Sequence, residues 1–167
     1  MRKIQCFIII CVLSVGLFMA AGPLAPEAAQ GDLWKESIEA PAPDFILKDL
    51  EGEEVRLSDY RGKTVLLYFM TTWCIKCRQT IPYLKEIHSK YKDKDVAVFA
   101  IDINEPPSRI RAYVEKHQLP YRVLLDTGKV ALSYNVIGVP TFILLDADGI
   151  IKCRQCRSLD MFLEKSS

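Results

Sequence analysis

Apolar residues along the chain follow two different periodicities, and the change between them predicts where strands and helices alternate. Residues 64–70 and 96–101 are almost continuously apolar or β-prone, as expected of strands that are covered on both faces of a sheet. Residues 77–91 instead place apolar side chains at helical spacing. The middle of the chain is therefore predicted to run strand, helix, strand.

Turn residues predict a β-hairpin at each end of this alternation. The first joins residues 44–47 to 55–57, and the second joins residues 142–145 to 150–153. The remaining predicted elements are a helix at 108–118 capped by Ser108, a strand at 122–126, and short helices at 129–134 and 158–165. Together they predict an α/β domain over residues 43–167, with a central mixed β-sheet flanked by helices and an N-terminal β-hairpin extension.

The first 21 residues differ from the rest, because a basic start, Met1-Arg2-Lys3, leads into an apolar run. Such a segment is typical of a signal peptide or of an N-terminal membrane anchor, which needs about 20 apolar residues to span a bilayer. Residues 22–42 are rich in Ala, Pro and Glu, which is typical of a linker. Both interpretations of residues 1–21 place the domain in a periplasmic or other extracytoplasmic position, either secreted or tethered to the membrane.

Charge argues against one class of partner. The chain has 22 Lys and Arg against 21 Asp and Glu, a formal net charge of +1, and no basic run. A nucleic-acid-binding protein would gather a basic excess on one face or in one segment. Nucleic acid is therefore not expected as a partner, and the length of 167 residues fits a single domain.

The six cysteines fall into three groups by position. Cys6 and Cys11 lie within the apolar run and are expected to act there as apolar residues. The other four form two Cys-x-x-Cys pairs, Cys74 with Cys77 and Cys153 with Cys156. A compartment outside the cytoplasm tolerates disulfides, so these two pairs carry the functional question.

The first pair has a setting that suits thiol chemistry. Cys74 follows a predicted strand and Cys77 lies in the first turn of a predicted helix, so unpaired N–H groups and the helix dipole favour a thiolate at Cys74. Lys76 adds a positive charge that favours the same form. A Cys74 thiolate can attack the disulfide of a partner, and Cys77 can resolve the mixed disulfide. The spacing alone also allows a structural disulfide or half of a metal site.

The residues around this pair resemble a known family. Thr72-Trp73-Cys74-Ile75-Lys76-Cys77 follows an apolar strand, Pro82 lies shortly after it, and Gly138-Val139-Pro140-Thr141 comes later in the chain. This combination resembles the thioredoxin superfamily. Within it, the N-terminal segment, Ala42-Pro43-Asp44-Phe45 and residues 57–63 are similar to the TlpA/ResA branch of redoxin thiol-disulfide oxidoreductases.

The resemblance implies a thioredoxin-like fold and a protein thiol-disulfide oxidoreductase without a bound cofactor or metal. Cys74 and Cys77 would be the catalytic residues and Pro140 a cis-proline facing them, while the Val139 backbone and Trp73 would position the substrate. The partners implied are thiols and disulfides of proteins, with apocytochrome c and a membrane electron donor as candidates in cytochrome c biogenesis. The chain is expected to act as a monomer.

Three positions bear on how Cys77 would exchange protons. Thioredoxins carry a buried acid six residues before the first cysteine, where this chain has Tyr68. ResA-like proteins carry a glutamate three residues after the second cysteine, where this chain has Thr80. Asp102, at the end of a predicted strand, could substitute for the missing acid, although an exposed strand-end aspartate is the expectation we favour.

The second pair, Cys153 and Cys156, falls where the last predicted strand leads into the last helix, a segment that passes beside the active site in thioredoxin-like folds. Three interpretations stay open: a second redox pair that exchanges electrons with the first, a structural disulfide, or a four-thiolate metal site built from both pairs. The last would make the chain a thiolate metal-binding or metal-delivery module. A further alternative is a peroxiredoxin-like peroxidase, to whose cysteine loop residues 71–74 bear a faint similarity.

Overall fold

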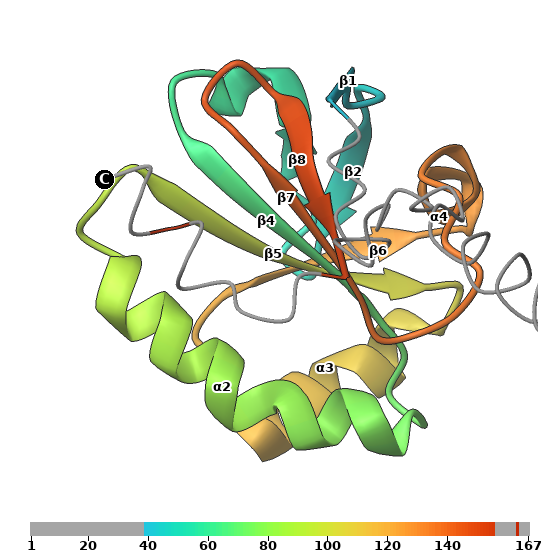
Figure 1. Ribbon diagram of the computed structural model, residues 1–167. Helices are drawn as coiled ribbons and strands as arrows, with labels where there is room; N and C mark the ends of the chain where they lie inside the picture. Colours follow the sequence, from blue (N-terminus) through green and yellow to red (C-terminus); the bar gives the residue numbers. More distant parts are fainter. Residues whose placement is uncertain (1–38, 156–162, 164–167) are drawn as a thin grey trace, which may run out of the picture. The chain divides into compact units, whose positions relative to one another are not determined.

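An eight-stranded mixed β-sheet forms the centre of the domain, in the strand order β1-β8-β7-β4-β5-β6-β2-β3 (Figure 1). The computed structural model describes residues 39–155 and Leu163, all within the unit Lys35–Ser167. The predicted signal or anchor segment, most of the predicted linker, Cys156 and all of the predicted C-terminal helix except Leu163 lie outside the described residues. None of the described helices is long and apolar enough to cross a membrane.

The elements follow the predicted order with shifted ends. The strands are β1 (Ala40–Pro41), β2 (Ile46–Asp49), β3 (Glu54–Arg56), β4 (Thr64–Met70), β5 (Val96–Ile103), β6 (Arg122–Asp126), β7 (Thr141–Leu145) and β8 (Ile150–Arg154). The helices are the 3-10 helix η1 (Leu57–Tyr60), α2 (Ile75–Tyr91), α3 (Pro107–His117) and α4 (Lys129–Ser133). β1 lies within the predicted linker and pairs antiparallel with β8, so the described sheet begins before the predicted domain boundary.

β4 occupies the middle of the sheet because both of its faces are apolar. All seven of its residues are buried, and it runs parallel to β5 and antiparallel to β7. Successive side chains of a strand point to opposite faces. Leu66, Tyr68 and Met70 therefore join one apolar cluster, and Val65, Leu67 and Phe69 join the other. This arrangement confirms the predicted mixed sheet and the prediction that β4 is covered on both faces.

Two helices cover one face of the sheet and a short helix covers the other. α2 places Leu84, and α3 places Ile110 and Tyr113, in the cluster that contains Tyr68. α4 packs its buried residues, Val130 and Ala131, into the cluster on the opposite face. Figure 1 shows α2 and α3 together beneath the sheet. The redox pair, at the start of α2, therefore lies on the face that α3 shares.

The predicted cap of α3 is wrong. The helix begins at Pro107, with Pro106 as its N-cap and without a capping side chain, so Ser108 lies inside the first turn. Proline suits this position because its φ is already helical and its missing N–H would have no partner there.

The expectation that Asp102 is exposed is also wrong. β5 continues to Ile103, so Asp102 pairs with Met70 of β4 on one side and with Leu125 of β6 on the other. Its side chain is 0% exposed. A carboxyl group therefore lies inside the domain.

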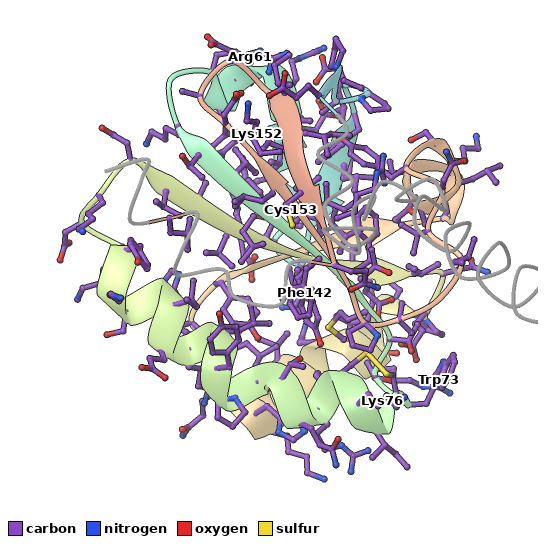
Figure 2. All side chains as sticks on the ribbon, viewed as in Figure 1. Arg61, Trp73, Lys76, Phe142, Lys152 and Cys153 are labelled. Carbon is purple, nitrogen blue, oxygen red and sulfur yellow. A yellow bond between two sulfur atoms is a disulfide. The ribbon has the colours of Figure 1, made fainter. Side chains whose placement is uncertain are left out.

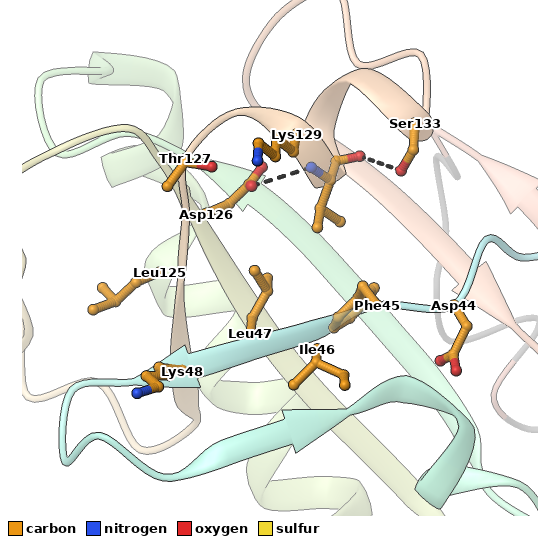
Figure 3. Close-up of a pocket in the computed structure, with 11 residues that line it drawn as sticks. Asp44, Phe45, Ile46, Leu47, Lys48, Leu125, Asp126, Thr127, Lys129 and Ser133 are labelled. Carbon is orange, nitrogen blue, oxygen red and sulfur yellow. Dashed lines mark hydrogen bonds between the residues drawn. The ribbon is translucent and has the colours of Figure 1, made fainter.

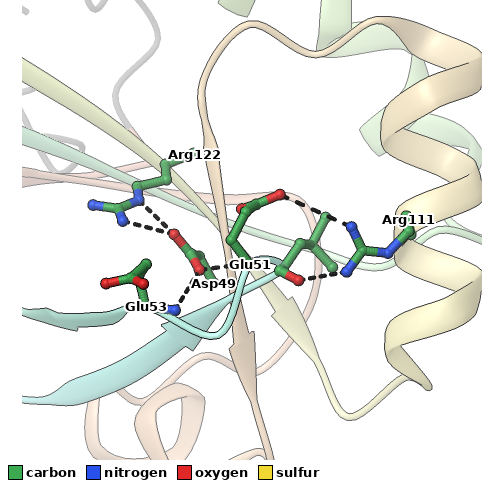
Figure 4. Close-up of polar contacts among 6 residues, drawn as sticks. Asp49, Glu51, Glu53, Arg111 and Arg122 are labelled. Carbon is green, nitrogen blue, oxygen red and sulfur yellow. Dashed lines mark hydrogen bonds and ion pairs between the residues drawn. The ribbon is translucent and has the colours of Figure 1, made fainter.

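The N-terminal hairpin of β2 and β3 is fixed to the sheet by the buried carboxylate of Asp49 (Figure 4). One oxygen accepts hydrogen bonds from the backbone N–H groups of Glu51 (3.0 Å) and Glu53 (2.9 Å). The other accepts from the Nε of Arg122 in β6 (2.7 Å), with Nη2 of the same guanidinium also at 2.7 Å. Burial raises the pKa of Asp49, but these donors lower it more, and the result lies below its ordinary value. Asp49 is therefore ionised at neutral pH.

We expect Asp49→Ala to lower the free energy of unfolding by about 2 kcal/mol, because two N–H groups and a guanidinium lose their acceptor. Glu53→Ala is the matched control, since Glu53 contributes its backbone N–H to the turn, and it should cost less than about 0.5 kcal/mol. Urea unfolding measures both. The folded-state pKa of Asp49 lies below its usual 3.8, so its contribution should persist above that pH and disappear as the pH falls below it. Equal losses in the two variants would contradict this account of the hairpin.

Candidate active site

Cys74 and Cys77 lie at the start of α2, immediately after the loop that follows β4. Cys74 is the N-cap residue of the helix, and its Sγ accepts a hydrogen bond from the backbone N–H of Cys77 at 3.0 Å. The two cysteines form a disulfide, with their Cα atoms 5.2 Å apart. In the reduced form, the same N–H group and the positive end of the helix dipole would stabilise a thiolate at Cys74.

The two sulfur-bearing residues differ in access to solvent. Cys74 is 7% exposed and Cys77 is 0% exposed. The residues on either side of Cys74, Trp73 and Ile75, are each 67% exposed. Figure 2 shows Trp73 and Lys76 at the outer end of α2, next to a disulfide. A partner arriving from solvent can therefore reach Cys74 but not Cys77.

The loop before β7 closes over Cys74. Its Val139–Pro140 peptide bond is cis, as the resemblance implies. The Val139 carbonyl oxygen lies 3.7 Å from Cys74 Sγ, to which the reduced thiol could donate a hydrogen bond. Trp73 and Val139 line one groove together with the fully exposed Ile137. The structure thus brings Val139 and Pro140, which lie far from Cys74 in the sequence, next to the redox pair and to Trp73, the residue before Cys74.

The hydroxyl groups of Tyr68 and Thr80 lie together beside Cys77. Tyr68 Oη lies 3.0 Å from the Cys77 carbonyl oxygen and 2.9 Å from Thr80 Oγ1, which donates to the same carbonyl at 2.8 Å. Burial raises the pKa of Tyr68 above its ordinary value, so its hydroxyl stays neutral. Tyr68 and Thr80, the two positions at which the resemblance would imply an acid, therefore meet at one backbone atom of Cys77.

Glu105 fixes the loop between β4 and Cys74, a role that the sequence analysis missed. Its carboxylate accepts hydrogen bonds from the backbone N–H (2.5 Å) and the hydroxyl (2.7 Å) of Thr72, and it pairs with Arg109 at 3.4 Å. Glu105 follows β5, the parallel neighbour of β4. The carboxyl ends of neighbouring parallel strands share one edge of a sheet, so this adjacency could have indicated a contact.

Asp102 and Glu105 form a buried carboxyl pair behind this loop. The oxygens of Asp102 make no hydrogen bond to the described residues within ordinary distance and angle limits. Burial, followed by the neighbouring Glu105, raises the pKa of Asp102 to about 8. Burial also raises the pKa of Glu105, but the bonds from Thr72 and the groups around it lower it more. At neutral pH, Asp102 is therefore mostly protonated while Glu105 is charged.

The second cysteine pair is described in part. Cys153 is half-buried on β8 and is disulfide-bonded, and Cys156 lies outside the described residues. The neighbouring Gln155 donates from its side chain to the Pro140 carbonyl oxygen at 3.1 Å, and from its backbone to Phe142 at 2.8 Å. Gln155 therefore connects the end of β8 to the cis-proline loop. That Cys153 and Cys156 form a second redox pair stays a prediction. Within residues 39–155, no three His, Cys, Asp or Glu side chains form a group that could hold a metal ion.

Another hollow lies away from the redox pair, between β2 and α4 (Figure 3). Its buried acid, Asp126, already accepts hydrogen bonds from the N–H groups of Val130 (3.1 Å) and Ala131 (2.8 Å). Asp126 therefore serves to bind the N–H groups at the start of α4.

Comparison with known proteins gives consistent matches. The model of the AhpC/TSA family matches residues 38–154. The thiol-disulfide oxidoreductase ResA of Bacillus cereus is 37% identical over 137 residues, which cover 80% of this chain and 79% of that protein. The thioredoxin-like protein YneN of Bacillus subtilis is 39% identical over 114 residues, 66% of each chain.

Solved structures agree. The thioredoxin domain of a thiol-disulfide oxidoreductase from Bacteroides vulgatus superposes with a TM-score of 0.70 at 28% identity, and the match covers 76% of this chain and 95% of that one. A thiol-disulfide oxidoreductase from Bacteroides fragilis gives a TM-score of 0.71 at 25% identity, over 75% and 98% of the two chains. These likenesses confirm the predicted thioredoxin-like fold.

We expect Asp102→Asn to change how stability depends on pH. The pKa of Asp102 is raised in the folded state from 3.8 to about 8, so the folded protein binds more protons than the unfolded chain between those values. Stability should therefore fall as the pH rises through this window. Asparagine does not ionise, so the variant should not show this loss of stability. One pKa unit corresponds to about 1.4 kcal/mol, so the free energy of unfolding of the variant, relative to that of wild type, should rise by at least about 1 kcal/mol from pH 5 to pH 9. Urea unfolding at the two pH values measures the gain. If the stabilities of wild type and variant changed equally with pH, the raised pKa of Asp102 would be refuted.

Proposed function

Because the chain belongs to the AhpC/TSA family and is a ResA-like thiol-disulfide oxidoreductase, we propose that it reduces cysteine pairs of proteins outside the cytoplasm. Cys74 is the attacking thiol and Cys77 the resolving thiol. The observation that carries these roles is the contrast between the 7% exposure of Cys74 and the 0% exposure of Cys77, at a helix N-terminus. A nucleophile must be reached by the partner's disulfide, whereas a resolving thiol needs to reach only its neighbour.

The reaction proceeds through two exchanges. The Cys74 thiolate attacks one sulfur of the partner's disulfide, so a Cys74–partner bond forms and the partner's other sulfur leaves as a thiolate. Cys77, having lost its proton, then attacks Cys74 Sγ, which releases the partner's remaining sulfur as a thiolate. Two electrons pass to the partner, and the product is the Cys74–Cys77 disulfide that the structure contains. A dithiol donor must then reduce this disulfide.

The loop around Pro140 positions the partner. The Val139 carbonyl oxygen lies 3.7 Å from Cys74 Sγ, and Val139 lines the groove that Trp73 also lines. An extended peptide can add to such a backbone segment by main-chain hydrogen bonds, with its cysteine held over Cys74. Trp73, which is 67% exposed, supplies apolar contact on the other side of the groove.

The N-terminal segment and the similarity to ResA support the proposed location and partners. A basic start and an apolar run at residues 1–21 support export, as a signal peptide or as a membrane anchor. Similarity to ResA supports a partner with a Cys-x-x-Cys pair, for which we propose apocytochrome c during cytochrome c maturation. The donor that restores the dithiol is then a membrane protein, because reduction must be supplied across the membrane.

Trapping tests the assigned roles. We expect Cys77→Ser to accumulate a mixed disulfide between Cys74 and a peptide that carries an oxidised Cys-x-x-Cys-His segment, because the resolving thiol is missing. Cys74→Ser should trap at least tenfold less at the redox pair, since the thiol that remains there, Cys77, is buried. Mass spectrometry of the non-reduced protein measures the adduct. Equal trapping by the two variants, or trapping through Cys77, would overturn the roles.

Thr80→Glu tests the proton environment of Cys77. A carboxylate at this position lies beside Cys77 and disfavours a second negative charge, so the thiol pKa of Cys77 should rise by about one unit. Thr80→Gln is the matched control, because it has nearly the same size without the charge. The pH dependence of alkylation, mapped to each cysteine, measures the shift. The same shift in both variants would mean that packing, and not charge, sets the thiol pKa.

A further inference from the structure

A basic hollow borders the active-site loop, between the start of α2 and the outer face of α3. It is lined by Thr72, Arg78, Arg109, Tyr113, Lys116 and His117, among others. Arg78, Arg109 and Lys116 are exposed cations. Because Thr72 lies two residues before Cys74, the hollow adjoins the redox pair.

Cations from both helices act on this hollow together. Burial lowers the pKa of His117, and Lys116, Arg78 and Lys85 lower it further through their charge. Burial raises the pKa of Tyr113, with Arg78 lowering it and Glu105 raising it. Positive charges of α2 and of α3 therefore act on the same residue of the hollow, His117.

One of the three cations of the hollow, Arg109, has an acid as its ion-pair partner among the described residues, and the other two have none. Among the charges that act on Tyr113 and His117, the single acid is Glu105, which already holds Thr72 and pairs with Arg109. Arg78 and Lys116 make no ion pair within the part of the chain that the structure describes. The whole chain carries a net charge of only +1, so composition does not account for such a cluster. The fold gathers it here.

We propose that Arg78, Arg109 and Lys116 form a docking surface for an acidic segment of the protein whose disulfide Cys74 attacks. This inference rests on the proposed function, because it concerns the partner of the same redox pair. Arg109 also lines the groove of Trp73 and Val139, so the hollow and the groove adjoin at this residue. A partner with its cysteine over Cys74 would place residues near that cysteine over the three cations.

Such a surface acts mainly on the rate of encounter. Charges of one sign beside a site steer an oppositely charged partner toward it and raise the association rate. Salt screens this attraction, since the Debye length is about 10 Å at 0.1 M ionic strength. Preference for an acidic partner should therefore be strong at low salt and weak at high salt.

The test compares three disulfide-bonded peptides that share one scaffold and differ in the residues beside the cysteines, which are glutamates, glutamines or lysines. The full chain in its dithiol form is mixed with each peptide, and the second-order rate constant of peptide reduction is measured at 20 mM and 500 mM salt. We expect the acidic peptide to react at least tenfold faster than the neutral one at low salt, and less than threefold faster at high salt. The basic peptide should be the slowest of the three.

The double variant Arg78→Gln, Lys116→Gln removes two cations. It keeps Arg109, whose ion pair with Glu105 is thus preserved. Lys48→Gln with Lys129→Gln is the matched control, because these exposed lysines line the hollow between β2 and α4. The readout is the ratio of acidic to neutral rate constants. Any change in the Cys74 thiol pKa alters both rates in the same way and leaves their ratio unchanged.

The ratio should fall at least fivefold in the first double variant and stay near the wild-type value in the control. An undiminished ratio in the first variant, or the same fall in both, would overturn the docking surface. Failure of the proposed function has a different signature, since none of the three peptides would then be reduced by wild type at either salt concentration.

Discussion

The chemistry of this domain depends on the hydrogen bond from the Cys77 N–H to Cys74 Sγ at the start of α2. A helix begins with backbone N–H groups that have no partner inside the helix, and here a sulfur atom takes the place of the usual capping oxygen. The capping contact that begins the helix is thus also the contact that stabilises a thiolate. β4, buried along its whole length, holds this helix start at the edge of the sheet where the cis-proline loop lies.

Uncharged, acidic and basic groups lie on different sides of the redox pair. Beside Cys77, the hydroxyls of Tyr68 and Thr80 meet at its carbonyl oxygen, so uncharged groups lie there. Behind Cys74, the Glu105 carboxylate holds Thr72 while the neighbouring Asp102 keeps its proton. Toward solvent, Arg78, Arg109 and Lys116 line a hollow beside the active-site loop. Positive charge near a thiol stabilises its ionised form, so these cations favour the Cys74 thiolate.

Patterns within single segments were enough to predict much of this structure. The apolar run at β4 predicted a central strand, and the motifs around Cys74 and Pro140 predicted which distant residues would meet. Contacts between segments without a shared motif were not predictable in the same way. The burial of Asp102 follows from how far β5 extends, and the role of Glu105 follows from the parallel pairing of β5 with β4. The start of α3 was misplaced because serine and proline both favour helix N-termini, and the local pattern does not rank them.

The central claim is that Cys74 and Cys77 form a reversible redox couple, and a thiol-disulfide redox titration of the full chain with mass-spectrometric mapping of the cysteine pairs tests it most directly. The account predicts that the Cys74–Cys77 disulfide forms and breaks reversibly as a two-electron couple, with a tenfold change in the equilibrium constant for about 30 mV. A chain in which Cys74 and Cys77 stay unpaired at every potential, with their thiols protected by a bound metal ion, would contradict it. In that case, the thiols would serve as metal ligands and not as a redox centre.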